Sequence, residues 1–211
     1  MPEPSQVVLF VVAAVALLLT PGPAVLYIVA RSIDQGRLAG IVSVLGVEVA
    51  NLLHVIAAAL GLSALLMSSA LAFGLVKYLG AAYLVYLGVR KLLVREELSQ
   101  PEVIERKRLA RIFYQGVVVN VFNPKTALFF LAFLPQFVDV SRGGVVGQIL
   151  FLGFIFVALG ICSDGLYALL AGTVGHWLRG NLGFLRAQRY FAGSVYIGLG
   201  VTTALSGSSK K

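Results

Sequence analysis

Thr20-Pro21-Gly22-Pro23 interrupts an apolar run that covers roughly residues 7–30. Proline has no backbone N–H, it clashes with the carbonyl four residues before it, and it pushes the preceding residue away from helical geometry. Two prolines flanking a glycine therefore predict a break in the helix. In lipid, a break is tolerated only where protein or a water-filled cavity satisfies the freed backbone groups.

A second break of the same kind is predicted at Asn123-Pro124-Lys125, within the apolar run Ile112–Val138. Each break has two interpretations. It is either a loop between two short buried helices or the interruption of a discontinuous transmembrane helix. Discontinuous helices commonly form the substrate site of a transporter.

The composition is that of a membrane protein. Of the 211 residues, 59% are hydrophobic and only 12% are charged, whereas soluble domains carry about 25% charged residues. We therefore expect an all-α polytopic membrane protein with one domain, residues 1–211. The N-terminal residues 1–6 lack the positive charge of a signal peptide, so we expect the first apolar run to be retained as a span.

Six runs are long enough for a spanning helix, which needs about 20 apolar residues. They cover roughly residues 5–31, 38–66, 71–93, 112–138, 145–175 and 184–205. The first and fourth contain the breaks. Weak matches of glycine, proline and tyrosine positions relate halves 1–93 and 112–205, joined by a polar cytoplasmic connector, 94–111. Because three helices is an odd number, we expect a 3+3 inverted repeat.

The loops between these spans differ in charge. Twelve of the 17 Lys and Arg residues fall on one side, four fall on the other, and Lys125 lies within a span. Cytoplasmic loops are rich in Lys and Arg, so the twelve-charge side is expected inside and both termini outside. If one broken segment only dips into the membrane, five spans result and one terminus changes side. The net charge of +8 thus reflects topology and does not indicate nucleic-acid binding.

Ionisable residues inside spans are candidates for function. Lys125, beside a break, could hold a carboxylate, or its side chain could extend to the membrane interface. Asp164 suits amine recognition or proton coupling, or it could be a structural partner of Lys125. Glu48, Asn51 and His54 are spaced by three residues on one helix face. His54 is either a proton relay or a hydrogen-bonded packing residue.

Enzyme chemistry is not expected. Only Asp164 is an aspartate well inside a span, whereas an aspartyl protease needs two such carboxylates. Ser43 and Ser63 are too far from His54 along one helix to form a nucleophile and base. One cysteine excludes an intrachain disulfide, and the two histidines have no zinc-site spacing, so neither a metal nor a cofactor is predicted.

Two small-residue pairs, Gly36-x-x-x-Gly40 and Gly46-x-x-x-Ala50, place small side chains one helical turn apart. Such spacing permits close contact between membrane helices. We expect these contacts within the chain, although the same surfaces could support a homodimer.

The chain resembles the LysE/RhtB family of amino-acid efflux proteins almost from end to end. The residues that carry the resemblance are Thr20–Pro23, Asn123–Lys125, Phe133–Phe137, Gly36 and Gly40, Gly46–His54, Lys77–Leu84, Gln115–Gly116 and Gly193–Gly200. The resemblance implies a six-helix exporter of amino acids or close derivatives in a bacterial inner membrane, driven by the proton gradient. The homoserine, threonine and leucine branch is the more similar one. Where the family often has glycine and then an acidic residue, this chain has Ala50 and Asn51.

The leading hypothesis is an alternating-access exporter whose substrate site is formed by Thr20–Pro23, Asn123–Lys125 and Asp164. Lys125 or freed N–H groups would bind the substrate carboxylate, and Asp164, Glu48 or freed carbonyls would bind its ammonium group. Proton-coupling candidates are Glu48, His54 and Asp164. The expected partners are an amino-acid substrate and membrane lipid. A passive channel and an exporter of another small zwitterion are the alternatives.

Overall fold

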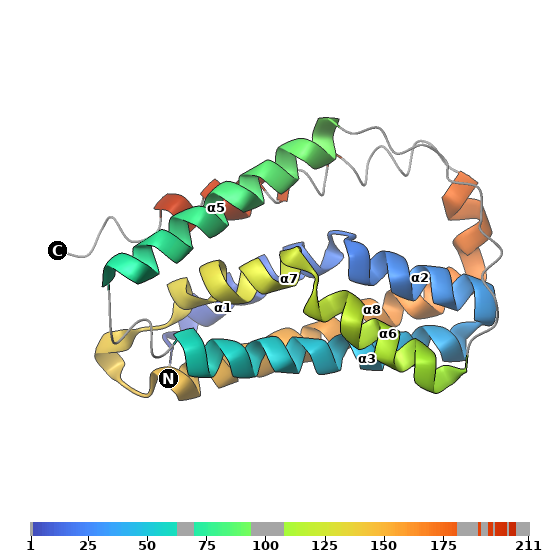
Figure 1. Ribbon diagram of the computed structural model, residues 1–211, viewed down its shortest axis with the longest axis horizontal. Coiled ribbons are helices and arrows are strands. Elements are labelled where there is room, and N and C mark those ends of the chain that lie inside the picture. The colour runs from blue at the N-terminus through green and yellow to red at the C-terminus, as the bar shows by residue number, and fades with distance from the viewer. Residues whose placement is uncertain are drawn as a thin grey trace.

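The computed structural model is a set of helices that run roughly along one axis, with α5 crossing beside the others (Figure 1). It describes residues 2–62, 70–93 and 108–180, together with 190, 194–195, 197–201 and 203–205. The elements are α1 (Pro4–Leu19), α2 (Pro23–Gln35), α3 (Arg37–Ala57), η1 (Ala58–Leu62), α5 (Ala70–Leu93), α6 (Leu109–Val121), α7 (Pro124–Leu128), η2 (Phe129–Phe133), η3 (Leu134–Phe137), η4 (Val140–Arg142) and α8 (Val145–Gly180). Within the described residues there is no strand, and the predicted all-α class is confirmed.

Both predicted breaks are present. The axes of α1 and α2 differ by 51° across the first break, and those of α6 and residues 124–137 differ by 48° across the second. Pro23 and Pro124 each stand in the first turn of the following helix, where the missing N–H has no partner to lose. The first and fourth predicted spans are therefore bent pairs of helices.

Four of the six predicted spans have counterparts that are long and apolar enough to cross a membrane. Two are the helical segments 37–61 and 145–172, and two are the bent pairs, each taken as one span. The third predicted span, 71–93, corresponds to helix α5, which has 24 residues. Most of the sixth and residues 94–107 of the connector lie outside the described residues.

Helices α3 and α8 run antiparallel and touch closely along their length. The contacts fall at three levels: Gly40 with Ala168, Glu48 with Gly160, and Val55 with Gly153. A methyl group added at Gly153 would lie 2.5 Å from Val55 Cγ1. Small residues thus allow the two helices to approach, as is usual in membranes where helix association depends on close packing.

Helix α3 also packs against α6 through Gly46 and Gly116. A methyl group at Gly46 would collide with the carbonyl oxygen of Phe113, and one at Gly116 would lie 2.9 Å from the carbonyl oxygen of Ser43. The close contact predicted for Gly46 is therefore confirmed, and it lies within the chain.

The prediction for the pair Gly36 and Gly40 is only half right. Gly40 lies against Ser32 and Ala168, as expected for a helix contact. No atom of the described residues lies within 4 Å of a methyl group placed on Gly36, whose φ of 88° forms the one-residue turn between α2 and α3. Glycine is needed at position 36 because residues with a Cβ rarely adopt this backbone conformation.

Aromatic rings fill the core between the breaks and the end of the bundle where α1 begins. The cluster consists of Phe10, Phe129, Phe130, Phe133, Phe137 and Phe156, all buried. Neighbouring rings have centroids 4.8 Å apart at the closest, between Phe129 and Phe156. Aromatic pairs in this range contribute beyond their burial. Large apolar side chains such as Val12, Leu53 and Phe154 face outward, as a lipid-facing surface requires.

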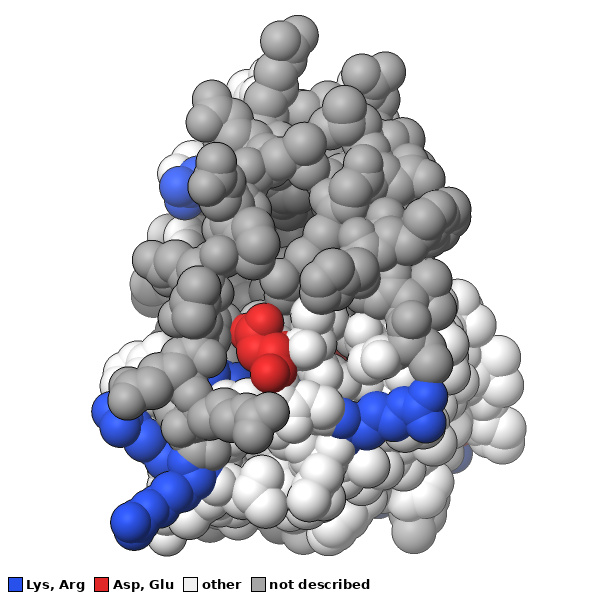
Figure 2. All heavy atoms as spheres, turned by 90° about the vertical axis from the view of Figure 1, so that its right-hand side faces the viewer, with Lys and Arg blue, Asp and Glu red and all other residues white. Residues whose placement is uncertain are grey.

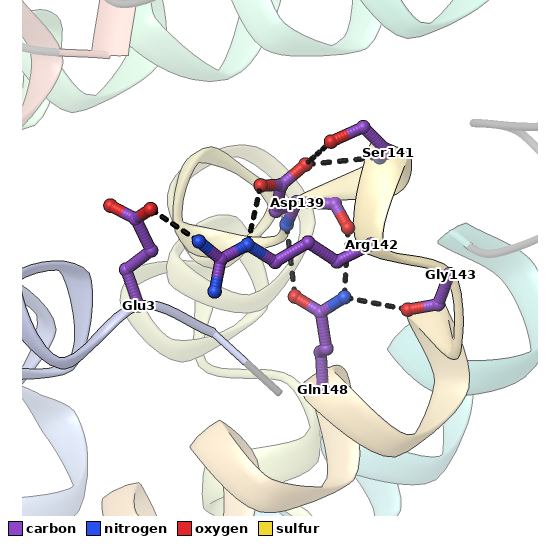
Figure 3. A network of polar contacts seen from close by, with 6 residues as sticks. All are labelled: Glu3, Asp139, Ser141, Arg142, Gly143 and Gln148. Carbon is purple, nitrogen blue, oxygen red and sulfur yellow. Dashed lines mark hydrogen bonds and ion pairs between the residues drawn. The ribbon is translucent and has the colours of Figure 1, made fainter.

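A polar loop closes this end of the bundle (Figure 3). The buried amide of Gln148 donates to the carbonyls of Asp139 and Gly143 and accepts from the Asp139 N–H. The exposed Arg142 pairs with Glu3 and, at 3.3 Å, with Asp139. The loop before α8 is thereby joined to the start of α1.

Candidate functional site

The two breaks meet at a direct contact. The Nζ of Lys125, in the first turn of α7, donates to the backbone carbonyl of Thr20 at 2.6 Å. Both side chains are buried. Because α1 ends at Leu19, carbonyls at this end of the helix lack an N–H donor from a following turn and need other donors. For the carbonyl of the capping residue Thr20, the donor is Lys125, which is 105 residues away in the sequence.

A second freed carbonyl at the same helix end has a partner on α8. The hydroxyl of Tyr167 donates to the Leu19 carbonyl at 2.9 Å. Tyr167 lies three residues after Asp164, so one helix brings a hydroxyl and a carboxyl toward the first break. The C-terminal end of α1 is thus held from both α7 and α8.

The sequence Asn-Pro-Lys explains the second break. The side-chain oxygen of Asn123 accepts a hydrogen bond from the Lys125 N–H at 3.1 Å, which caps the start of α7. Pro124 occupies the next position, where its fixed φ favours a helix start. This local geometry places the Lys125 side chain against the end of α1.

Asn120, which the sequence interpretation did not include, is the centre of a buried hydrogen-bond network. Its amide nitrogen donates to Asn51 Oδ1 at 2.7 Å and to the Val47 carbonyl at 3.0 Å. Its Oδ1 accepts from Asn123 Nδ2 at 3.1 Å and from Thr126 Oγ1 at 3.0 Å. The network therefore connects α3 with both sides of the second break. The available signal was the spacing of Asn120 and Asn123 within an apolar run.

The network continues to a buried carboxyl group. Asn51 Nδ2 donates to Glu48 Oε2 at 2.9 Å, while Glu48 Oε1 has no hydrogen-bond partner among the described residues. The Glu48 carboxyl packs on Gly160, where an added methyl group would lie 2.5 Å from Oε1. Gly160 is one helical turn before Asp164.

Asp164 is also buried, and its Oδ1 has no hydrogen-bond partner among the described residues. It does not form an ion pair with Lys125, although both residues line one cavity. That cavity has a volume of about 20 Å³. Its other polar lining residues are Asn51, Asn120, Asn123 and Thr126. The volume suffices for a single water molecule and is far below the few hundred Å³ of typical ligand pockets.

His54 belongs to the same region but not to the cavity. Its Nε2 lies 3.1 Å from the Asn120 carbonyl oxygen, and its ring stacks on Phe130 with an interplanar angle of 8°. Glu48, Asn51 and His54 thus lie on one side of α3 as predicted. The contacts of His54 are those of a hydrogen-bonded packing residue.

The predicted substrate-site residues fall into two groups. Gly22, Asn123, Lys125 and Asp164 line the cavity, and Thr20 is joined to it through Lys125. The prolines 21, 23 and 124 do not line it, and they act on the backbone direction at the breaks. Asn51, Asn120 and Thr126 also line the cavity, and Tyr167 contacts the end of α1, although none of the four was among the predicted site residues.

Apolar helices that are broken around buried charged and amide side chains define a class of membrane protein, the transporters with discontinuous helices. Comparison with known proteins identifies the family within that class. Residues 15–207 match the model of the LysE type translocator, which covers most of the chain. The chain belongs to the LysE family of membrane translocators, and it is a transporter rather than an enzyme.

Similar proteins occur in several bacteria. An uncharacterized membrane protein of Vibrio cholerae is 30% identical over 195 residues, 92% of this chain and 94% of the relative. A homoserine/homoserine lactone efflux protein of Salmonella typhimurium is 27% identical over 195 residues, with the same coverage. The uncharacterized membrane protein YrhP of Bacillus subtilis is 27% identical over 206 residues, 93% of this chain and 97% of the relative. No solved structure matches the chain.

Proposed function

We propose that this protein is a proton-coupled secondary exporter of amino acids or close derivatives in a bacterial inner membrane. The observation that carries the proposal is the contact of Lys125 with the Thr20 carbonyl, beside Asp164, whose Oδ1 has no hydrogen-bond partner among the described residues. A cation and a carboxyl group at one cavity match the two charged ends of a zwitterion. The relative named as a homoserine/homoserine lactone efflux protein supports this substrate class.

In the proposed bound state, the substrate carboxylate takes Lys125 Nζ from Thr20, and the substrate ammonium binds the freed Thr20 carbonyl and Asp164. Lys125 and the Thr20 carbonyl each exchange one partner for another, and Asp164, whose Oδ1 has no hydrogen-bond partner among the described residues, gains one. Both charges of the substrate are then paired, which avoids the cost of several kcal/mol for an unpaired charge in a membrane interior.

The small cavity supports an alternating-access mechanism. A volume of about 20 Å³ holds no amino acid, so substrate entry requires the helices around the breaks to move apart. The bends between α1 and α2 and between α6 and α7 are the natural positions for such movement, because the regular helix hydrogen bonds are already absent there.

Proton coupling is assigned to the two carboxyl groups, Glu48 and Asp164. Each has one oxygen without a hydrogen-bond partner among the described residues. Glu48, on α3, packs on Gly160 of α8, and Asp164 lies one turn after Gly160 on the same helix. A proton carried by this pair would be exchanged for a cationic ammonium group. His54 contributes to packing beside them.

The test is transport into inside-out vesicles from cells that make the protein, with and without a proton gradient. Radiolabelled homoserine, threonine, leucine, lysine and arginine would be offered separately. We expect gradient-dependent accumulation of a neutral amino acid of the homoserine, threonine or leucine type. Equilibration without accumulation would instead assign a passive channel. No flux of any of them, from inserted protein, would remove the amino acid from the proposal.

The matched variants are Lys125→Met and Asp164→Asn, which keep the shape of the side chains and remove their charges. Arg142→Gln, at the loop before α8, removes a charge far from the breaks and serves as the control. Loss of transport in the first two, with normal membrane insertion and a normal control, is the expected result. Undiminished transport by Lys125→Met would reject the proposed site.

A further inference from the structure

A groove of about 730 Å³ lies between α2 and α6 at the end of the bundle opposite the aromatic cluster. Three arginines line it, Arg31 from α2 and Arg108 and Arg111 from the start of α6. Figure 2 shows this end of the molecule, with basic side chains at several positions and an acidic side chain near the middle of the view. None of the described residues that line the groove is acidic.

Arg31 is the unusual member of the group because it is 94% buried, yet only one of its guanidinium nitrogens has a hydrogen-bond partner among the described residues. Its side chain is 6% exposed, and its NH2 donates to Gln115 Oε1 at 3.2 Å. Neither Nε nor NH1 has a hydrogen-bond partner among the described residues. An arginine is always charged, so a buried one needs a compensating anion.

The position of Arg31 is fixed by its surroundings. Its guanidinium lies 5.4 Å from the centroid of the Tyr27 ring, a cation–π geometry. The Tyr27 hydroxyl in turn donates to the Ile112 carbonyl of α6 at 2.7 Å. The cation is therefore held in the groove and cannot swing freely to solvent.

No acidic side chain of the described residues pairs with the groove. The ion pairs found among them lie at the other end of the bundle, around Arg142. Asp34 follows Arg31 by one turn, yet no ion pair joins the two, and Asp34 Oδ2 has no hydrogen-bond partner among the described residues. The groove therefore presents cationic groups that form no ion pair with any residue the structure describes.

The remaining wall of the groove is apolar and faces outward. Tyr114 and Val118 line it and are 67% and 56% exposed, and Phe122, one turn further along α6, is 80% exposed. These three side chains are spaced by four residues and form one ridge that leads from Arg111 toward the middle of the span. A cationic end joined to an apolar ridge matches the headgroup and acyl chain of an anionic lipid.

We propose that this groove binds an anionic phospholipid, with its phosphate between Arg31, Arg108 and Arg111 and one acyl chain along Tyr114, Val118 and Phe122. Basic pockets between membrane helices are a known type of lipid-headgroup site. The bound lipid supplies the anion that Arg31 otherwise lacks. This proposed lipid site does not depend on which solute the protein transports.

Native mass spectrometry of the purified full-length protein in detergent would test the assignment. The probes are phosphatidylglycerol, phosphatidylcholine with the same acyl chains, and free glycerol 3-phosphate. We expect phosphatidylglycerol to bind at least about fivefold more tightly than phosphatidylcholine, since each basic residue near an anionic headgroup contributes roughly that factor. Equal binding of the two lipids would overturn the proposal. Competition by glycerol 3-phosphate as strong as that by the lipid would assign a free-phosphate site instead.

Arg31→Gln should reduce the preference for phosphatidylglycerol about fivefold, and the exposed Arg111→Gln should do so even if the buried variant folds poorly. Arg142→Gln, an arginine at the opposite end, is the matched control and should keep the preference. An unchanged preference in a folded Arg111→Gln variant, or an equal loss in the control, would contradict the site.

Discussion

The carboxyl group of Glu48 lies directly on the backbone of Gly160, so closely that a methyl group there would be 2.5 Å from Oε1 and 2.9 Å from Oε2. Glycine at this position makes room for a buried carboxyl group between α3 and α8. The contact also fixes the height of Glu48 relative to Asp164, one turn further along α8. The position of Glu48 is therefore set by contact with a residue that has no side chain.

Gly160→Ala should abolish or strongly reduce transport. The new methyl group displaces Glu48 and disturbs its hydrogen bond from Asn51, and overpacking of this kind typically costs about 1–3 kcal/mol of stability. Vesicle transport and the thermal unfolding temperature in detergent would be measured together.

Gly165→Ala is the matched control for that variant. It lies on the same helix, and no atom of the described residues is within 4 Å of a methyl group placed there. Replacing glycine by alanine inside a helix is favourable by roughly 0.5–1 kcal/mol, so this variant should be as stable as the parent or slightly more stable. Equal behaviour of the two alanine variants would mean that Gly160 does not position Glu48.

Much of this arrangement could be predicted from the sequence, because proline and glycine act locally. Pro21, Pro23 and Pro124 restrict the backbone wherever they stand, so both breaks were correctly predicted. Lys125 and Asp164 stood out because charge is costly within an apolar run. Lys125 and Asp164 both line one cavity, and their role in substrate binding stays a prediction.

The partners within the site could not be predicted in the same way. Asn120 and Thr126 are uncharged, and their importance depends on which helix faces them in the folded chain. The donor to the Leu19 carbonyl, Tyr167, is 148 residues away, and no local pattern relates them. Pairing across such distances is set by the packing of α3, α6 and α8, which the sequence periodicity leaves open.

Asn120→Leu should be the most destabilising single change in the buried network. It leaves the Asn51 side-chain oxygen, the Asn123 amide and the Thr126 hydroxyl without their present partner. Each buried polar group without a partner costs about 1–3 kcal/mol. Thermal unfolding in detergent would be compared with that of Thr126→Val, which removes only one of these bonds. A smaller loss for Asn120→Leu than for Thr126→Val would contradict the central role of Asn120.

Gly46→Ala should prevent the close approach of α3 and α6. The added methyl group would collide with the Phe113 carbonyl, a backbone atom that cannot rotate away as a side chain could. We expect a lower unfolding temperature and a lower yield of folded protein. Gly147→Ala, on α8 with open space around it, is the control and should leave both unchanged. A normal unfolding temperature for Gly46→Ala would mean that the helices can separate at no cost.

Gln148→Leu should loosen the loop that closes the bundle before α8, at the opposite end from the arginine groove. The buried amide of Gln148 makes three hydrogen bonds to the backbone of Asp139 and Gly143, and leucine of similar size can make none of them (Figure 3). Hydrogen exchange of residues 139–144 would therefore become faster, and the unfolding temperature would fall.

Arg142→Gln provides the comparison within the same loop. Its contacts to Glu3 and Asp139 are exposed, and exposed ion pairs contribute only about 0–1 kcal/mol. The exchange rates should thus rise much less than in Gln148→Leu, and added salt should reduce the difference between Arg142→Gln and the parent. If Arg142→Gln loosened the loop as much as Gln148→Leu did, the ion pairs and not the buried amide would hold this end of the protein closed.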